Sequence, residues 1–286
     1  MDFAKARAPL AAIGAGSLAA MLATVLNPAG ILVREVFPGA GEDPDFAGLL
    51  LASLAHGAAL AWLASHTHLR GPSLAVAVGG LYAATTGGMA QIESWVFLSL
   101  WNPVLTGPQI ARILIHQTTQ AALVGALAAL FFHRAPVDPA LPGIALHRGP
   151  SLAWRLGAVA ALYVPIYLLA GAFIAMPLAG GAFDEVYGAL QVPAWMPLFQ
   201  LARGLAWAGL AWLLLRLTRG GGYSARTTVA LGLAIPMDAG LLLRNPIFPD
   251  ALRRAHLVEV GVSMLVFGWL AAGLLTDRGR TEARSG

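Results

Sequence analysis

The sequence contains no cysteine and only one lysine among its 18 basic residues, and charged residues make up 11% of its 286 positions. The absence of cysteine excludes disulfide bonds, iron–sulfur ligation, thiolate metal sites and cysteine nucleophiles. The charged fraction lies far below the roughly 25% of an ordinary globular domain, while hydrophobic residues reach 58%. This composition excludes a water-soluble protein and indicates an integral membrane protein.

Seven or eight apolar runs, most of them close to 20 residues long, are separated by short segments that hold most of the charge. About 20 apolar residues in a helix cross the hydrocarbon core of a bilayer. We therefore predict an all-α integral membrane protein with eight transmembrane helices. They cover residues 8–26, 46–65, 71–101, 109–132, 152–176, 195–217, 227–243 and 251–275. The first is expected to break at Asn27-Pro28, because proline lacks the N–H that a helix needs.

Basic residues gather in alternate connections between the predicted spans. They are Lys5, Arg7, His66, His68, Arg70, Arg134, Arg148, Arg155, Arg216, Arg219, Arg226, Arg278, Arg280 and Arg284. By the positive-inside rule this side is cytoplasmic, which places both termini there. We predict a multi-pass protein of a bacterial-type inner membrane whose partner is the lipid bilayer. No basic tract suits a nucleic acid, because the arginines lie at helix ends.

The two halves of the chain resemble each other in sequence. Residues 54–57 match residues 201–204, and residues 125–129 match residues 268–272. We therefore predict two tandem four-helix halves. Since each half has an even number of spans, the repeat is parallel. The predicted units are a first half (residues 1–134), a cytoplasmic connection (135–150) and a second half (151–286).

Ionisable side chains inside the predicted spans are costly, so they are expected to face the bundle interior. They are His56, Glu93, Arg112, His116, Arg203, Asp238, His256 and Glu259, most of them in the outer half of the membrane. Spacings of three or four residues align polar side chains on one helix face. Such stripes consist of Gln109, Arg112, His116 and Gln120; of Gln200, Arg203 and Trp207; and of Arg253, His256, Glu259 and Ser263. We expect them to face protein, water or a cofactor.

Two histidines lie at similar depth on parallel spans, His56 on the second and His116 on the fourth. This placement suits bis-imidazole ligation of a haem, and haem b is the cofactor we predict. Arg112, Arg253 and Arg254 lie near the outer boundary, where they are placed to pair with the haem propionates.

In this layout the chain resembles haem A synthases, which carry histidines on the even-numbered spans of two four-helix halves. His56, His116 and His256 match those positions. Arg203 stands at the corresponding place in the sixth span, and Ser53 stands where the family has a glutamate. The resemblance implies a haem-related membrane activity.

Other interpretations use the same residues differently. A divalent metal would be held by nitrogen and oxygen ligands from His56, Glu93, His116, His256 and Glu259. A transporter would use them as a proton or ion relay. In a structural role, Arg203 forms a buried ion pair with Glu259. A second pair would join Arg112 to Glu93.

The sequence thus predicts a haem- or metal-binding membrane redox protein, with a small-molecule or ion transporter, or an accessory subunit of a membrane complex, as the alternative. Other membrane subunits and quinone are candidate partners. Neither a catalytic residue nor an enzymatic reaction is defined by the sequence.

Overall fold

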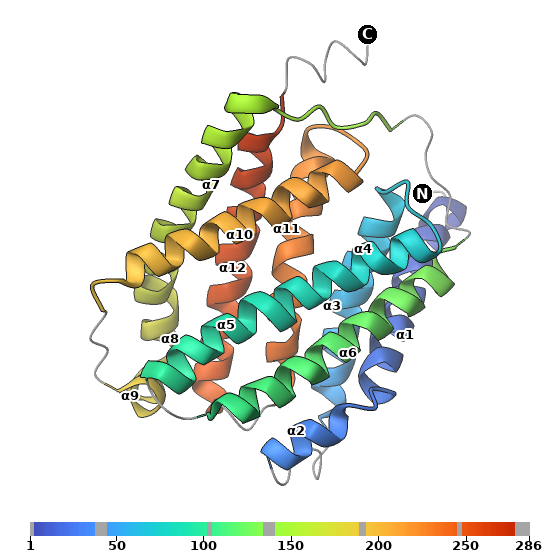
Figure 1. The fold of residues 1–286 in the computed structure, drawn as a ribbon. Coiled ribbons are helices and arrows are strands. Elements are labelled where there is room, and N and C mark those ends of the chain that lie inside the picture. Colours follow the sequence, from blue (N-terminus) through green and yellow to red (C-terminus); the bar gives the residue numbers. More distant parts are fainter. Residues whose placement is uncertain are drawn as a thin grey trace.

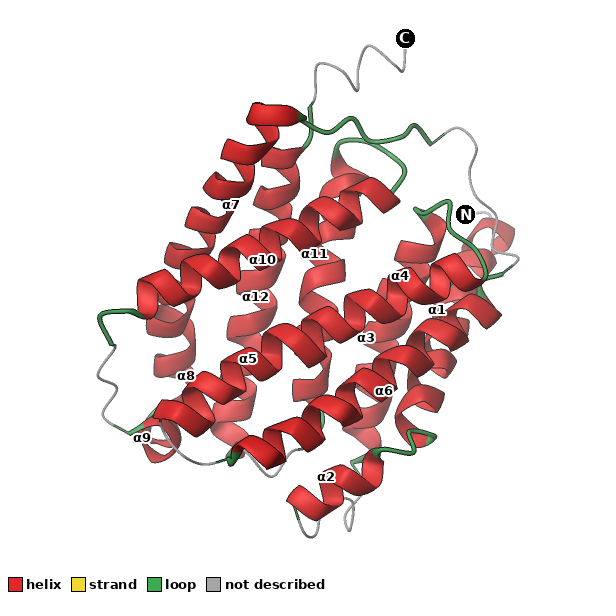
Figure 2. Ribbon diagram, viewed as in Figure 1, coloured by secondary structure: helices red, strands yellow, loops and turns green. Residues whose placement is uncertain are grey.

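The computed structural model describes residues 3–37, 45–101, 105–133, 141–188, 193–244 and 248–277. In these ranges the chain folds into helices joined by short connections, and it forms no strand (Figures 1 and 2). The all-α prediction is therefore confirmed.

The helices follow one another as α1 (Phe3–Val25), α2 (Gly30–Val36), α3 (Phe46–Ser65), α4 (Pro72–Tyr82), η1 (Ala83–Met89), α5 (Ala90–Trp95), η2 (Val96–Trp101), α6 (Gly107–Phe131), α7 (Gly149–Ala170), η3 (Gly171–Ala175), α8 (Met176–Ala179), α9 (Gly181–Tyr187), α10 (Met196–Leu217), α11 (Tyr223–Asp238), η4 (Ala239–Leu242) and α12 (Asp250–Leu275). The segments η1, η2 and η3 are π-helical turns within longer helices, and η4 is a 3₁₀ turn.

Six helices of the described chain are long and apolar enough to cross a membrane. They are Phe46–Ser65, Pro72–Leu98, Gly107–Phe131, Gly149–Ala179, Met196–Leu217 and Asp250–Leu275. A seventh candidate is the pair formed by α1 and α2, which is bent by 55° at the predicted Asn27-Pro28 break. The predicted seventh span corresponds to α11, which has only 16 residues before the 3₁₀ turn. The structure thus supports six or seven spans by length and composition.

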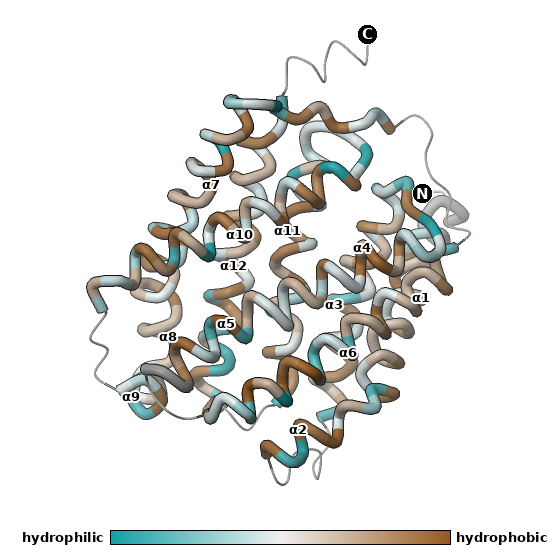
Figure 3. Tube along the Cα trace, in the orientation of Figure 1, coloured by the Kyte–Doolittle hydropathy of each residue, from teal (hydrophilic) through white to brown (hydrophobic). Residues whose placement is uncertain are grey.

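The outer surface of the long helices is apolar. Figure 3 shows hydrophobic colours along most of each helix, and Val76, Phe173 and Leu198 each expose at least 70% of their surface. Large apolar side chains in such numbers would be unfavourable in water but match lipid tails. The protein is therefore a multi-pass membrane protein in its architecture.

The arginine-rich connections meet at one end of the bundle, where α1 begins and α12 ends (Figure 1). Backbone hydrogen bonds join them: Arg219 N–H to His66 O (2.6 Å), Gly220 N–H to Pro142 O (2.8 Å) and Asp277 N–H to Ala145 O (2.9 Å). Among the described residues, these connections therefore lie at one end of the bundle. Arg134, Arg278, Arg280 and Arg284 lie outside them.

At the opposite end, Asp45 ties α3 to the segment after η4. Its carboxylate accepts hydrogen bonds from the backbone N–H of Gly48 (2.8 Å) and of Arg244 (3.1 Å). Both bonds favour the ionised form, so they hold the pKa of Asp45 below its usual value.

The strongest pairings unite α1 with α3 and α4 with α6 in the N-terminal group, and α7 with α10 and α11 with α12 in the C-terminal group. Glycines allow two of these approaches. A Cβ at Gly125 of α6 would lie 2.9 Å from Gly79 Cα of α4, and one at Gly268 of α12 would lie 2.7 Å from Ala230 Cα of α11. Both distances are shorter than real Cβ contacts, so only glycine fits.

We predict that Gly125→Ala lowers the free energy of unfolding by roughly 1–3 kcal/mol, because the added methyl group must push α4 away. The matched control is Gly80→Ala on α4, where a Cβ would meet nothing within 4 Å. Thermal unfolding in detergent measures both. Equal melting temperatures for the two variants would contradict the close approach of α4 and α6.

Candidate functional site

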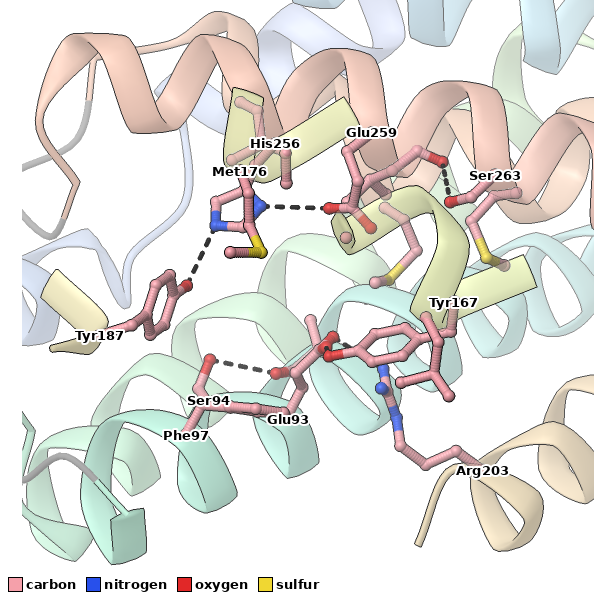
Figure 4. Close-up of a pocket in the computed structure, with 18 of the residues that line it drawn as sticks. Glu93, Ser94, Phe97, Tyr167, Met176, Tyr187, Arg203, His256, Glu259 and Ser263 are labelled. Atoms are coloured by element: carbon pink, nitrogen blue, oxygen red, sulfur yellow. Dashed lines mark hydrogen bonds and ion pairs between the residues drawn. The ribbon is translucent and has the colours of Figure 1, made fainter. Parts of the chain in front are cut away.

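A cavity of about 590 Å³ opens among α5, α7, α9, α10 and α12. Most of its wall is aromatic or aliphatic, and a few polar side chains enter it from different helices (Figure 4). Such apolar cavities with converging polar groups are typical of sites for small molecules. The cavity is therefore the candidate functional site.

Helix irregularities border the cavity on two sides. Phe97 belongs to the π-helical segment η2, and Gly171 and Ala172 belong to η3. A π-helical turn inserts an extra residue, shifts the side chains that follow, and often occurs at functional sites. Both turns therefore contribute residues directly to the cavity wall.

Arg203 of α10 and Glu93 of α5 form an ion pair across the cavity. The distance from Arg203 Nη2 to Glu93 Oε2 is 2.7 Å, and Tyr167 donates its hydroxyl to Glu93 Oε1 at 3.0 Å. The Arg203 side chain is 3% exposed, whereas that of Glu93 is 30% exposed. The carboxylate is therefore the accessible member of the pair.

The guanidinium of Arg203 is held by further contacts but is not fully satisfied. Its Nη1 donates to Gln200 Oε1 at 3.0 Å, and the rings of Tyr163 and Tyr167 lie 5.8 Å and 5.6 Å from its central carbon. Its Nε and the indole nitrogen of the fully buried Trp207 have no hydrogen-bond partner among the described residues. Both residues line the cavity. Both nitrogens have less than 1 Å² of accessible surface, so they lie behind the cavity wall and not at its surface.

A second polar group occupies the α12 wall. His256 Nδ1 lies 3.1 Å from Glu259 Oε2, and His256 Nε2 lies 3.0 Å from the Tyr187 hydroxyl of α9. Figure 4 shows His256 and Glu259 projecting from α12 toward the side on which Glu93 and Arg203 lie. The predicted stripes on α10 and α12 therefore both supply side chains to the cavity wall.

The partner predicted for Arg203 was wrong. Glu93 forms the ion pair, and Glu259 instead contacts His256 one turn earlier on its own helix. The second predicted pair is also replaced, because Arg112 lies 3.6 Å from Glu35 of α2. Both differences arise from helix neighbours that depth along the chain does not specify.

The predicted haem ligands have separate partners in the structure. His56 Nδ1 lies 2.9 Å from the Tyr82 hydroxyl, and His116 Nδ1 lies 3.1 Å from Asn27 Nδ2. Helix α1 packs against both α3 and α6, which carry these histidines. The stripe on α6 therefore serves contacts with α1 and α2, including a hydrogen bond from Gln120 to Thr24 (2.9 Å).

The arginines expected at haem propionates differ in their surroundings. Arg253 donates to Asp250 Oδ1 (3.0 Å) and to the carbonyl of Leu241, while Arg254 is exposed. With Arg112 bound to Glu35, two of the three arginines already have protein partners.

The predicted metal ligands do not converge. No group of three or more histidine, aspartate and glutamate residues that could hold a metal occurs in the described part of the chain. Glu93, His256 and Glu259 line the cavity, but His56 and His116 do not. The structure thus gives no support to the five-residue metal site.

Tyrosines were missing from the sequence-based site. Tyr167 and Tyr187 each bond a titratable group of the cavity, and Tyr163 adds an aromatic wall. A usable signal existed, since a tyrosine hydroxyl within an apolar run needs a hydrogen-bond partner when buried.

Comparison of the chain with protein families, with curated proteins and with solved structures gave no match.

We predict that Arg203 and Glu93 are energetically coupled. Replacing Arg203 with methionine leaves the Glu93 carboxylate without its countercharge, and the expected loss is about 3 kcal/mol. The double variant Glu93→Gln/Arg203→Met should lose much less than the sum of the two single changes. Unfolding by sodium dodecyl sulfate in mixed micelles measures the free energy of unfolding of the two single variants and the double variant.

The control is the Glu259→Gln/Arg203→Met pair, whose effects should add because Glu259 bonds His256. Energetic coupling of Arg203 to Glu259 but not to Glu93 would contradict the Arg203–Glu93 ion pair and support the Arg203–Glu259 pair predicted from the sequence.

Proposed function

We propose that this protein is a membrane carrier that binds a small amphiphilic molecule in the cavity. The observation that carries the proposal is an apolar space of about 590 Å³ whose wall includes the polar side chains of Glu93, His256 and Glu259. The apolar wall favours an apolar body, and the partly exposed Glu93 carboxylate favours a polar group on the same molecule.

This function agrees with the transporter predicted as the alternative from the sequence. The haem hypothesis has weaker support, because His56 bonds Tyr82 of α4 and His116 bonds Asn27 in the break between α1 and α2. An accessory structural subunit would have no need for charged groups around an open space, since packed apolar residues stabilise a bundle at lower cost.

The carrier is further proposed to cross a bacterial-type inner membrane eight times, with both termini cytoplasmic. Three observations support this topology: the arginine-rich connections share one end, α1 begins and α12 ends at that end, and α11 packs along the whole-span helix α12. Helix α11 and η4 together extend from residue 223 to 242, which suffices for one crossing.

The two helix groups are proposed to be a tandem parallel repeat. Gly57 of α3 and Gly204 of α10 belong to the two matching sequence segments. A Cβ at Gly57 would lie 2.7 Å from Ile13 O of α1, and one at Gly204 would lie 2.5 Å from Ala160 O of α7. The matching glycines therefore make equivalent helix contacts in the two groups.

We predict that reporter fusions after residue 222 and at the C-terminus report the cytoplasm, while a fusion after residue 246 reports the outside. The reason is that the positive-inside rule assigns the Arg216–Arg226 region to the cytoplasm, and α11 must then cross. Alkaline phosphatase and fluorescent-protein reporters make the measurement. The same side for residues 222 and 246 would exclude α11 as a span.

The carrier is tested with a single introduced thiol, since the chain has no cysteine. Ser94→Cys places the thiol on the cavity wall, and Ser53→Cys, at a residue that is 3% exposed, is the buried control. A neutral, membrane-impermeant sugar-linked methanethiosulfonate should label Ser94→Cys from either face of sealed vesicles, because a carrier opens to both sides. The control should stay unlabelled. Labelling of Ser94→Cys from one face only, or from neither, overturns the carrier.

A further inference from the structure

A second cavity, of about 460 Å³, lies at the arginine-rich end of the bundle. Its wall is formed by the connection that precedes α7, the first turn of α7 and the end of α10. Figure 1 shows the start of α7 and the end of α10 on the side where α1 begins and α12 ends. No residue lines both this cavity and the candidate functional site. We call it the arginine cavity.

Two guanidinium groups border the arginine cavity. Arg148 directly precedes α7, and Arg216 lies in the last turn of α10. Both residues are exposed, and neither has a hydrogen-bond or ion-pair partner among the described residues. The central carbon of the Arg216 guanidinium lies 5.0 Å from the centre of the Trp212 ring, which also lines the cavity. Arginine stays charged and presents several donors in one plane, an arrangement that suits phosphate groups.

The rest of the polar wall also favours an anion. His147 lines the cavity, and its Nδ1 lies 3.8 Å from the carboxylate of Asp277. Asp277 itself does not line the cavity, nor does any other carboxylate of the described residues. Gly149 places the N-terminus of α7 in the wall, and no side chain caps this end of the helix. The N-terminus of a helix carries a partial positive charge, which adds to that of the two arginines.

Backbone contacts fix the segment that forms one wall of the arginine cavity. Gly143 forms an isolated bridge with Arg219 in the connection between α10 and α11, and Leu146 forms one with Thr276 after α12. The segment between these two bridges is therefore held against the ends of α10 and α12 by the protein alone. The cavity is thus built into the fold.

The remaining side chains of the wall are apolar. Ile144, Leu146, Leu152 and Trp212 line the cavity and pack against the hydrophobic core of the C-terminal helix group. Helices α7 and α10 belong to the segments long enough to cross a membrane, so their ends lie where hydrocarbon meets water. Basic pockets between membrane helices at this level are suited to lipid head groups. The cavity therefore offers a charged part for an anion and an apolar part beside it.

We propose that the arginine cavity binds a phosphate group, which pairs with Arg148 and Arg216 and so links the start of α7 to the end of α10. Such a group has two sources, the head group of an anionic phospholipid and phosphate dissolved in the water. The proposal does not depend on the carrier function, because the two cavities share no lining residue.

Native mass spectrometry of the protein in detergent tests the lipid source. The probes are dioleoylphosphatidylglycerol, which is an anion, and dioleoylphosphatidylcholine, which has the same chains but no net charge. The anionic lipid should bind with a Kd at least about fivefold lower. Arg148→Gln and Arg216→Gln should each weaken its binding about fivefold, and the double variant about 20-fold or more.

Arg226→Gln is the matched control. It removes the same charge near the start of α11, and the guanidinium of Arg226 lies over the Trp269 ring at 5.6 Å, much as that of Arg216 lies over Trp212. Arg226 does not line the arginine cavity, so its replacement should change the Kd by less than about twofold. Equal losses in the control and in the two cavity variants would reduce the effect to general attraction by the basic end, and would overturn the proposal.

Equilibrium dialysis with radioactive inorganic phosphate tests the dissolved source, with the protein in detergent and no anionic lipid present. Binding of phosphatidylglycerol alone that depends on both arginines assigns the site to a lipid head group. Binding of inorganic phosphate alone with the same dependence assigns it to dissolved phosphate, and binding of both assigns it to the phosphate group itself. If the unmodified protein neither prefers phosphatidylglycerol nor binds inorganic phosphate, the proposal is wrong, whatever the folding of the variants.

Discussion

The arrangement around the cavity depends on the guanidinium of Arg203, which keeps its charge under all relevant conditions. Arg203 is 4% exposed, so a carboxylate must lie against it, and Glu93 meets it at 2.7 Å. Because Glu93 belongs to α5 and Arg203 to α10, the pair joins the N-terminal and C-terminal helix groups. The two long side chains reach across a gap that the backbones do not close, and that gap is part of the cavity.

This requirement explains why the two matching segments behave differently. His56 and Arg203 stand at corresponding places beside Gly57 and Gly204. The imidazole of His56 is short and reaches the Tyr82 hydroxyl of α4 at 2.9 Å. The longer side chain of Arg203 instead reaches Glu93 of α5, on the opposite wall of the cavity.

Much of the fold could be predicted from the sequence, because apolar runs and proline mark helix limits locally. The predicted second span coincides with α3, Phe46–Ser65, and the chain breaks at Asn27-Pro28 as expected. The stripes containing Arg203 and His256 were correctly expected to face inward. The π-helical turns η2 and η3 were not predicted, since they arise from packing between helices and have no local sequence signal as strong as proline.

The sequence could not predict which side chains of the site contact one another, for a physical reason. Depth in a membrane follows from position along a helix, but contact also requires that the two helices be neighbours, which only tertiary packing decides. His56 and His116 have similar predicted depth, yet His56 bonds Tyr82 of α4 and His116 bonds Asn27 in the break between α1 and α2. Glu93, Arg203 and Glu259 come from three helices that border one space. Side chains that form one site in the membrane must therefore lie at similar depth. Among side chains at similar depth, only those that line the same cavity can form the site.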